Sequence, residues 1–208
     1  MARQAERKAA HRNAILDAAE QLLARAGHAA TIEAIADHAG LAKGTLYNHF
    51  ADKDALLRRV AQRVREAAAL KVAQAIQGIE DAPGRLYAGI RVYLELAREE
   101  PDRGAILVQL IQDSIDPASP VNAALLAEIE RGNTRGELNA KPVNAAVMMV
   151  LAVVQAAMNL AMGTAGRPPD PLGAEALVRF AIVGLSASPK PTDSGWRARQ
   201  DSNLQPSA

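Results

Sequence analysis

The chain has 208 residues and a net charge of +1 at pH 7, so its overall charge does not indicate a nucleic-acid partner. It has no cysteine, which excludes disulfides, thiolate nucleophiles and cysteine-based zinc sites. Helix-forming aliphatic and charged residues dominate, and aromatic residues make up only 3% of the chain. This composition predicts an all-α protein.

No apolar region follows the N-terminal segment MARQAERKAAHR, so the segment does not have the pattern of a signal peptide. The longest unbroken apolar run, residues 145–154, is too short to cross a bilayer before Gln155 interrupts it. We therefore expect a cytoplasmic protein with no membrane partner.

The first two predicted helices are joined by a short loop. Apolar side chains recur at helical spacing over residues 15–26, and Gly27 follows where a helix commonly ends. Thr31 can cap a second helix through its hydroxyl, and Ile35 belongs to the inner face of that helix. Gly40 then ends it.

A third helix is predicted over residues 43–50, and Asp52 can cap a fourth that extends to about Gly78. The fourth helix carries an apolar residue at every fourth position: Leu56, Val60, Val64 and Ala68. Three helices, the last two short and joined by a glycine turn, are typical of a helix-turn-helix.

The remaining chain also has helical patterns. Helices are predicted over residues 86–98, 103–113, 121–131, 143–162 and 174–186. Residues 143–162 are apolar almost all round, which indicates a helix that is buried or shared with a partner. The polar segment 188–208 is predicted to be disordered, and its end resembles the product of a reading frame that enters a transfer-RNA gene. We assign this tail no function.

The stretch LAKGTLYNHF, residues 41–50, has two different faces. Ala42, Leu46 and Phe50 share one side of a helical wheel and suit a core. Gly44 and Asn48 point away from it. Because an exposed glycine inside a helix costs about 1 kcal/mol relative to alanine, this glycine indicates close approach to another molecule.

The polar side chains of the same stretch match the chemical groups of DNA. Lys43, Thr45 and Asn48 can read base edges when a helix enters the major groove. Tyr47 and His49, at the margins, can bind phosphates. We therefore interpret this helix as a DNA-recognition helix.

Cations flank it on both sides. Lys53 lies in the first turn of the fourth helix, where the helix dipole disfavours a cation unless a phosphate also binds. Residues 1–8 are predicted to form a basic N-terminal arm. The cations between Arg3 and Arg12 can contact the DNA backbone or an adjacent minor groove.

Residues 31–57, TIEAIADHAGLAKGTLYNHFADKDALL, resemble the helix-turn-helix of TetR-family transcriptional regulators. The landmarks are Thr31, Ile35, Ala36, Gly40, Gly44, Thr45, Leu46, Tyr47, Phe50, Lys53, Leu56 and Leu57. The resemblance implies a DNA-binding domain over residues 9–69, joined through the long fourth helix to a helical ligand-binding and dimerisation domain over residues 70–187. Many members have a serine where Ala42 stands, so one capping hydroxyl is missing.

The resemblance also implies a function: a ligand-responsive homodimeric repressor that binds a palindromic DNA operator, without catalysis, cofactor or metal. The implied phosphate contacts are Thr31, Tyr47, His49 and Lys53, and the implied base contacts are Lys43, Gly44 and Thr45. The homodimer is expected to form through about residues 143–186. The small residues there are Ala157, Ala161, Ala176, Ala181 and Gly184, and an intramolecular core explains some of them equally well.

An unidentified small-molecule effector is expected among the fourth to eighth helices. The candidate lining residues are Tyr93, Leu107, Leu110, Met149, Gln155, Met158 and Asn159, with Gln109 and Met148 beside them. Gln155 and Asn159 are the better candidates, because buried amides require partners. A methionine series at helical spacing is more often core than pocket.

Two other classes of protein stay open. An enzyme is disfavoured because no histidine follows His49 and no spacing of acids or bases indicates a catalytic site. The four histidines also lack the spacing of metal ligands. A helical adaptor, or a small-molecule-binding protein without specific DNA binding, would show no salt-dependent affinity for DNA.

Overall fold

The computed structural model describes residues 2–112, 122–163 and 166–187, so the predicted disordered tail lies outside the described residues. The helices are α1 Ala2–Ala26, α2 Ile32–His38, α3 Lys43–Tyr47, α4 Lys53–Ala75, α5 Ala82–Glu99, α6 Pro101–Gln112, α7 Ala123–Arg135, α8 Val143–Met162 and α9 Pro171–Leu185, with a 3-10 turn at Gly27–Ala29. The described residues contain no strand and only one isolated bridge, between Leu138 and Ser186. The all-α prediction is confirmed.

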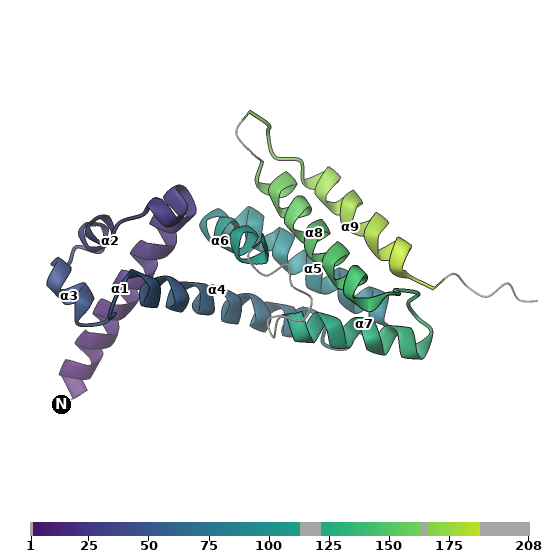
Figure 1. Cartoon of the computed structure of the whole chain (residues 1–208), viewed down its shortest axis with the longest axis horizontal. Coiled ribbons are helices and arrows are strands. Elements are labelled where there is room, and N and C mark those ends of the chain that lie inside the picture. The colour runs from purple at the N-terminus through teal and green to yellow at the C-terminus, as the bar shows by residue number, and fades with distance from the viewer. Residues whose placement is uncertain (1, 113–121, 164–165, 188–208) are drawn as a thin grey trace, which may run out of the picture.

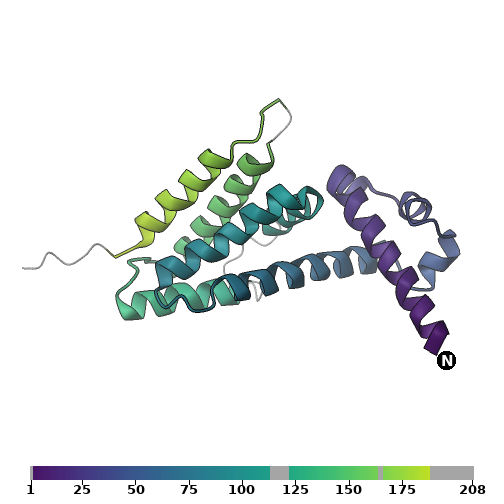
Figure 2. The ribbon, with the colours of Figure 1, turned by 180° about the vertical axis from the view of Figure 1, so that it is seen from behind.

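The helices form an elongated molecule with α2 and α3 at one end (Figure 1). The long helix α4 runs from that end toward α7, and α1 crosses it near its start. Seen from behind, α8 and α9 lie side by side, away from α2 and α3 (Figure 2). Helix α8 also packs on α5, α6 and α7, so α5–α9 form one helical body.

The core of the N-terminal helices has the predicted composition. Ile15, Ile35 and Leu46 are fully buried and join α1, α2 and α3 in one cluster with α4. On α4 the predicted row with four-residue spacing is confirmed, because Leu56, Val60, Val64 and Ala68 are all buried. This core holds the short α3 in place, since a five-residue helix is not stable by itself.

The helix ends follow the predicted chemistry. The Thr31 hydroxyl oxygen accepts a hydrogen bond from the Ala34 backbone N–H at 3.1 Å and caps α2. The Asp52 carboxylate accepts one from the Ala55 N–H at 2.6 Å and caps α4. Gly40, with φ of +66°, makes the turn between α2 and α3. A side chain there would be strained, so glycine is required by the turn.

Most predicted boundaries differ from the structure by a few residues, and three of the differences concern the N-terminal helices. Residues 2–8, expected as a separate basic arm, are the first turns of α1. Their alanines, arginines, glutamine, glutamate and lysine are strong helix formers, and charge alone does not report conformation. Helix α3 ends at Tyr47 rather than residue 50, and α4 ends at Ala75 rather than Gly78.

Helix α8 is unusually apolar for a surface element. A stretch of 18 of its 20 residues has a mean hydropathy of 2.0, so the helix is long and apolar enough to cross a membrane, and 39% of that stretch is buried. Core helices of soluble proteins can be as long and as apolar as this one, and α8 contacts four other helices. Much of its apolar surface nevertheless remains uncovered in a single chain.

That uncovered surface continues onto α9. Large apolar side chains on the two helices are exposed to solvent: Met148, Met149, Leu172, Phe180 and Val183, with Phe180 at 76% and Val183 at 73% exposure. We call these five residues the α8–α9 patch. Ala157 and Ala161, by contrast, are buried within the chain, so the intramolecular interpretation holds for both.

Candidate DNA-binding site

The exposed face of α3 carries the predicted contact residues. Leu46 is buried beneath the helix, so the residues on the other side point outward. Lys43, Gly44, Tyr47 and Asn48 are exposed, and Thr45 and His49 are partly exposed. The helix lies at one end of the molecule, beside α2 (Figure 1).

Gly44 lies in open space. A Cβ atom built at this position would meet no other atom within 4 Å, and the backbone φ is not positive. Neither a turn nor packing within the described chain requires glycine here. Close approach by an external surface is the remaining physical reason for it.

The Gly44→Ala variant is expected to separate folding from binding. Alanine should raise the free energy of unfolding by about 0.5–1 kcal/mol, because it has the higher helix propensity and meets no clash. The same methyl group should weaken DNA binding. Urea denaturation and fluorescence anisotropy on a selected DNA site would measure the two effects, and a variant that binds DNA at least as well as the parent would contradict our interpretation of Gly44.

Lys43 is engaged within the protein. Its ammonium group donates a hydrogen bond to Glu33 of α2, and it lies 5.9 Å from the centre of the Tyr47 ring. The hydrogen bond raises the pKa of Lys43 and lowers that of Glu33. Both side chains are more than half exposed, so the pair is weak enough to exchange for a base or a phosphate.

His49 lies beside the N-terminal turns of α1. The rings of His11 and His49 make an edge contact with centroids 6.3 Å apart, and Arg12 lies 5.8 Å from the centre of the Phe50 ring. Burial lowers the pKa of His49, and the positive charges of Lys8, His11 and Arg12 lower it further. A phosphate bound here would supply the missing negative charge. Lys8 and Arg12, two of the expected basic residues, therefore lie near His49 and Phe50 on a helix.

Thr31 and Lys53 mark the starts of α2 and α4. The Thr31 oxygen accepts the capping bond described above, which leaves its hydroxyl hydrogen able to donate to a phosphate. Lys53 is the first residue of α4 and is partly exposed. Its neighbour Asp52 already occupies the Ala55 N–H, so a phosphate here would depend on the lysine side chain.

The predicted effector-binding residues differ in burial and in position among the described helices. Leu107 and Met158 are buried core residues, and Met149 is 38% exposed on the α8–α9 patch. Tyr93, Gln155 and Asn159 are partly buried, and burial raises the pKa of Tyr93. Only Leu110 and its neighbour Gln109 line a cavity described for this chain, between α1, α4 and α6.

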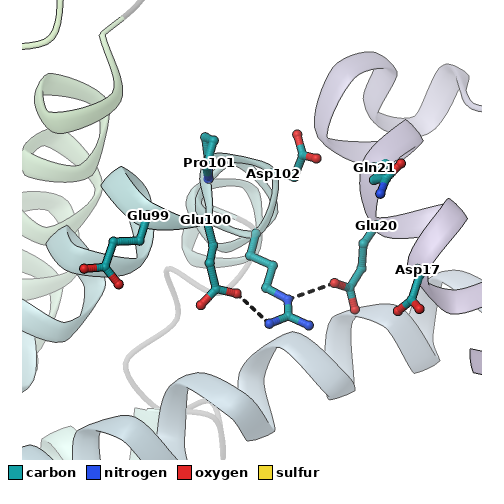
Figure 3. Close-up of a pocket in the computed structure, with 8 residues that line it drawn as sticks. Asp17, Glu20, Gln21, Glu99, Glu100, Pro101 and Asp102 are labelled. Carbon is teal, nitrogen blue, oxygen red and sulfur yellow. Dashed lines mark hydrogen bonds and ion pairs between the residues drawn. The ribbon is translucent and has the colours of Figure 1, made fainter.

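An ionic cluster around the buried Glu20 joins α1, α4 and α6, and sequence reasoning missed it. The Glu20 side chain on α1 is only 8% exposed, and its carboxylate lies 2.8 Å from Arg103 Nε and 3.1 Å from Arg63 Nε. Arg103 also donates to Glu100 at 2.6 Å (Figure 3). Lys71 of α4 bonds the same Glu100 at 2.7 Å and is the main cause of its lowered pKa. The available signal was a glutamate beside Ala19, within the apolar face of α1.

The sequence has matches among known proteins. A family model described as bacterial regulatory proteins, tetR family, matches residues 15–60. The transcriptional regulator UidR of Escherichia coli K12 is 28% identical over 116 residues, which are 55% of this chain and 56% of UidR. The transcriptional activator FasR of Mycolicibacterium smegmatis is 33% identical over 86 residues, which are 41% of this chain and 39% of FasR. The matched part of the chain thus spans about half the length of UidR and less of FasR.

Solved structures share the fold over most of their length. A TetR family transcription regulator from Marinobacter aquaeolei VT8 superposes with a TM-score of 0.72 at 18% identity, covering 88% of this chain and 99% of that one. RolR, whose structure contains the ligand resorcinol, superposes with a TM-score of 0.60 at 18% identity, covering 98% of both chains.

Proposed function

Because the chain belongs to the TetR family of bacterial regulatory proteins, we propose that it is a sequence-specific DNA-binding transcriptional regulator. In this proposal it is a cytoplasmic homodimer without enzymatic activity that represses transcription from a palindromic operator until a small molecule releases it. Residues 9–69 bind DNA, and residues 70–187 bind the effector and the second subunit.

One observation carries the proposal: α3 presents exposed polar side chains and an uncovered glycine on a face held by a buried core. In the proposed complex, Lys43, Gly44, Thr45 and Asn48 face bases in the major groove. Phosphates on either side are bound by Thr31, Tyr47, His49 and Lys53. Lys8 and Arg12 of α1 lie near His49 and add sequence-independent affinity.

The α8–α9 patch supports the homodimer. Monomeric proteins rarely expose several large apolar side chains together, and Leu172, Phe180 and Val183 are each more than 70% exposed. A second copy of the same helices would bury them in a symmetric four-helix contact. Two subunits would then place their α3 helices in successive major grooves, roughly 34 Å apart.

The effector part of the proposal is supported by analogy and by polar residues inside the helical body. RolR, a protein of the same fold, binds resorcinol. In this chain Tyr93, Gln155 and Asn159 are partly buried among apolar helices and need polar partners. A ligand that prefers one arrangement of α4 and α6 would shift the population of DNA-competent dimers. The ionic cluster at Glu20 connects those helices to α1.

Selection from random double-stranded DNA tests the proposal. The expected result is a palindromic consensus with two half-sites one helical turn apart, bound with an affinity that falls steeply with salt. A reporter gene behind that consensus would then show lower transcription when the protein is present, whereas higher transcription would assign it as an activator, as FasR is named.

The alternative is a helical adaptor or a small-molecule-binding protein. It would enrich no DNA sequence, and its affinity for DNA would not depend on sequence. Adding cell extract to the selection separates this outcome from the need for a co-ligand, because a co-ligand would restore enrichment.

A further inference from the structure

A cavity of about 510 Å³ lies where α1, α4 and α6 meet, and of the residues considered for the effector only Gln109 and Leu110 line it. Its volume is within the range of small-molecule binding sites. Leu23 of α1, Val60 of α4, and Ile106 and Leu110 of α6 line it, and no carboxylate is among its lining residues. We call it the junction cavity. It is suited to an apolar molecule.

Two arginines of α4 also line the junction cavity. Arg58 and Arg65 are seven residues apart, which places them on the same side of the helix and roughly 10 Å apart along its axis. In the described part of the chain neither makes a hydrogen bond or ion pair. Two other arginines of α4 are paired, Arg59 with Glu66 and Arg63 with Asp17 and Glu20. Helix α4 therefore directs its uncompensated positive charge to the cavity.

Two other cavities have the opposite character. One, of about 350 Å³ and shown in Figure 3, is lined by Glu99, Asp102 and further carboxylates, and its Arg103 is held by Glu20 and Glu100. Another, of about 170 Å³, contains Arg85, which is 3.0 Å from Glu128. Both would repel an anion or offer it only arginines that are already paired. The junction cavity combines an aliphatic wall with available cations.

We propose that the junction cavity binds a small amphipathic anion, an aliphatic carboxylate whose chain packs on Leu23, Ile106 and Leu110 and whose carboxylate binds Arg58 or Arg65. The charge complementarity identifies the head group, and the aliphatic lining identifies the tail. Binding here does not depend on the function proposed above. Its effect on DNA does rest on that function: a ligand wedged between α6 and the start of α4 changes how α1–α3 sit on the helical body.

Isothermal titration calorimetry with the full chain and no DNA tests the binding. Decanoate, kept below its micelle concentration, is expected to bind one molecule per chain. Decanol has the tail without the charge, and butyrate has the charge with little tail, so both should bind at least about tenfold more weakly. Absence of decanoate binding, or equal binding of decanol, would overturn the proposal.

Variants locate the site. The double variant Arg58→Gln, Arg65→Gln is expected to weaken decanoate binding by about tenfold or more, since charge-assisted hydrogen bonds are lost. Ala61→Phe, which fills the cavity from α4, should weaken it as well. The matched control is Arg59→Gln, which removes a paired arginine of the same helix and should leave binding unchanged. Unchanged binding in the double variant, or equal loss in the control, would place the anion elsewhere.

If the protein bound no DNA sequence, the function proposed above would be wrong, but the decanoate result would be unaffected.

Discussion

The Lys53→Ala variant is expected to bind every DNA sequence more weakly than the parent protein. Lys53 is the first residue of α4, and because Asp52 already occupies the Ala55 N–H, a phosphate at this helix start would depend on the lysine side chain. Loss of one phosphate contact per subunit should cost roughly 2 kcal/mol per dimer, about thirtyfold in affinity. The slope of log K against log salt should become shallower by about 0.9 for each lost phosphate. Anisotropy titrations over a salt series measure both quantities.

Thr45→Ala is the contrasting variant. Thr45 lies on the outward side of α3 between Gly44 and Leu46, so we expect it to contact a base rather than a phosphate. Its replacement should relax the preference at one position of each half-site by about 1–3 kcal/mol and leave the salt slope unchanged. If Lys53→Ala kept the parent affinity and salt slope, the assignment of the start of α4 to a phosphate would be wrong.

Phe180→Glu is expected to dissociate the dimer. The Phe180 side chain is 76% exposed in the single chain, so a glutamate there should not disturb the fold of the subunit. In a symmetric contact the two carboxylates would be buried without partners. The cost should be at least about 3 kcal/mol, more than a hundredfold in the dimer dissociation constant. Sedimentation equilibrium measures the dissociation constant, and binding to a two-half-site DNA should fall with it.

The matched control is Leu70→Glu. Leu70 is also a large exposed apolar residue, 61% exposed, but it lies on α4 outside the α8–α9 patch. This variant should remain dimeric. A Phe180→Glu protein that stays dimeric would show that the subunits associate through another surface, and dissociation of both variants would show that the effect is not specific to the patch.

The sequence predicted the fold well where local rules dominate. Gly27 and Gly40 were expected to end helices, and both have positive φ values in the structure. The predicted range 143–162 matches α8. Leu46 and Phe50 were expected to be inward and are buried, whereas Ala42, expected on the same face, is exposed at the start of α3. Periodicity and capping are local signals, so one sequence contains enough information to use them.

The sequence could not predict contacts that depend on distant parts of the chain. Met149 was expected to line an effector pocket, but α8 is apolar on nearly every side, so periodicity did not indicate which side faces the core. Glu20 bonds Arg103, which is 83 residues away, and no spacing rule connects the two. The grouping of Arg58 with Leu110 in one cavity likewise depends on how α4 packs against α6.

The ionic cluster around Glu20 also affects how the contact between α1, α4 and α6 responds when these helices are displaced. The attraction between two charges decreases only with the inverse of their separation, whereas a dispersion contact loses a quarter to a half of its energy when a gap of about 0.5–1 Å opens. Glu20, Arg63 and Arg103 connect three helices by ion pairs, beside a cavity where aliphatic contacts are incomplete. We therefore expect that α1 can shift by a fraction of an ångström against α6 without breaking these ion pairs, while the helices on either side keep their shape.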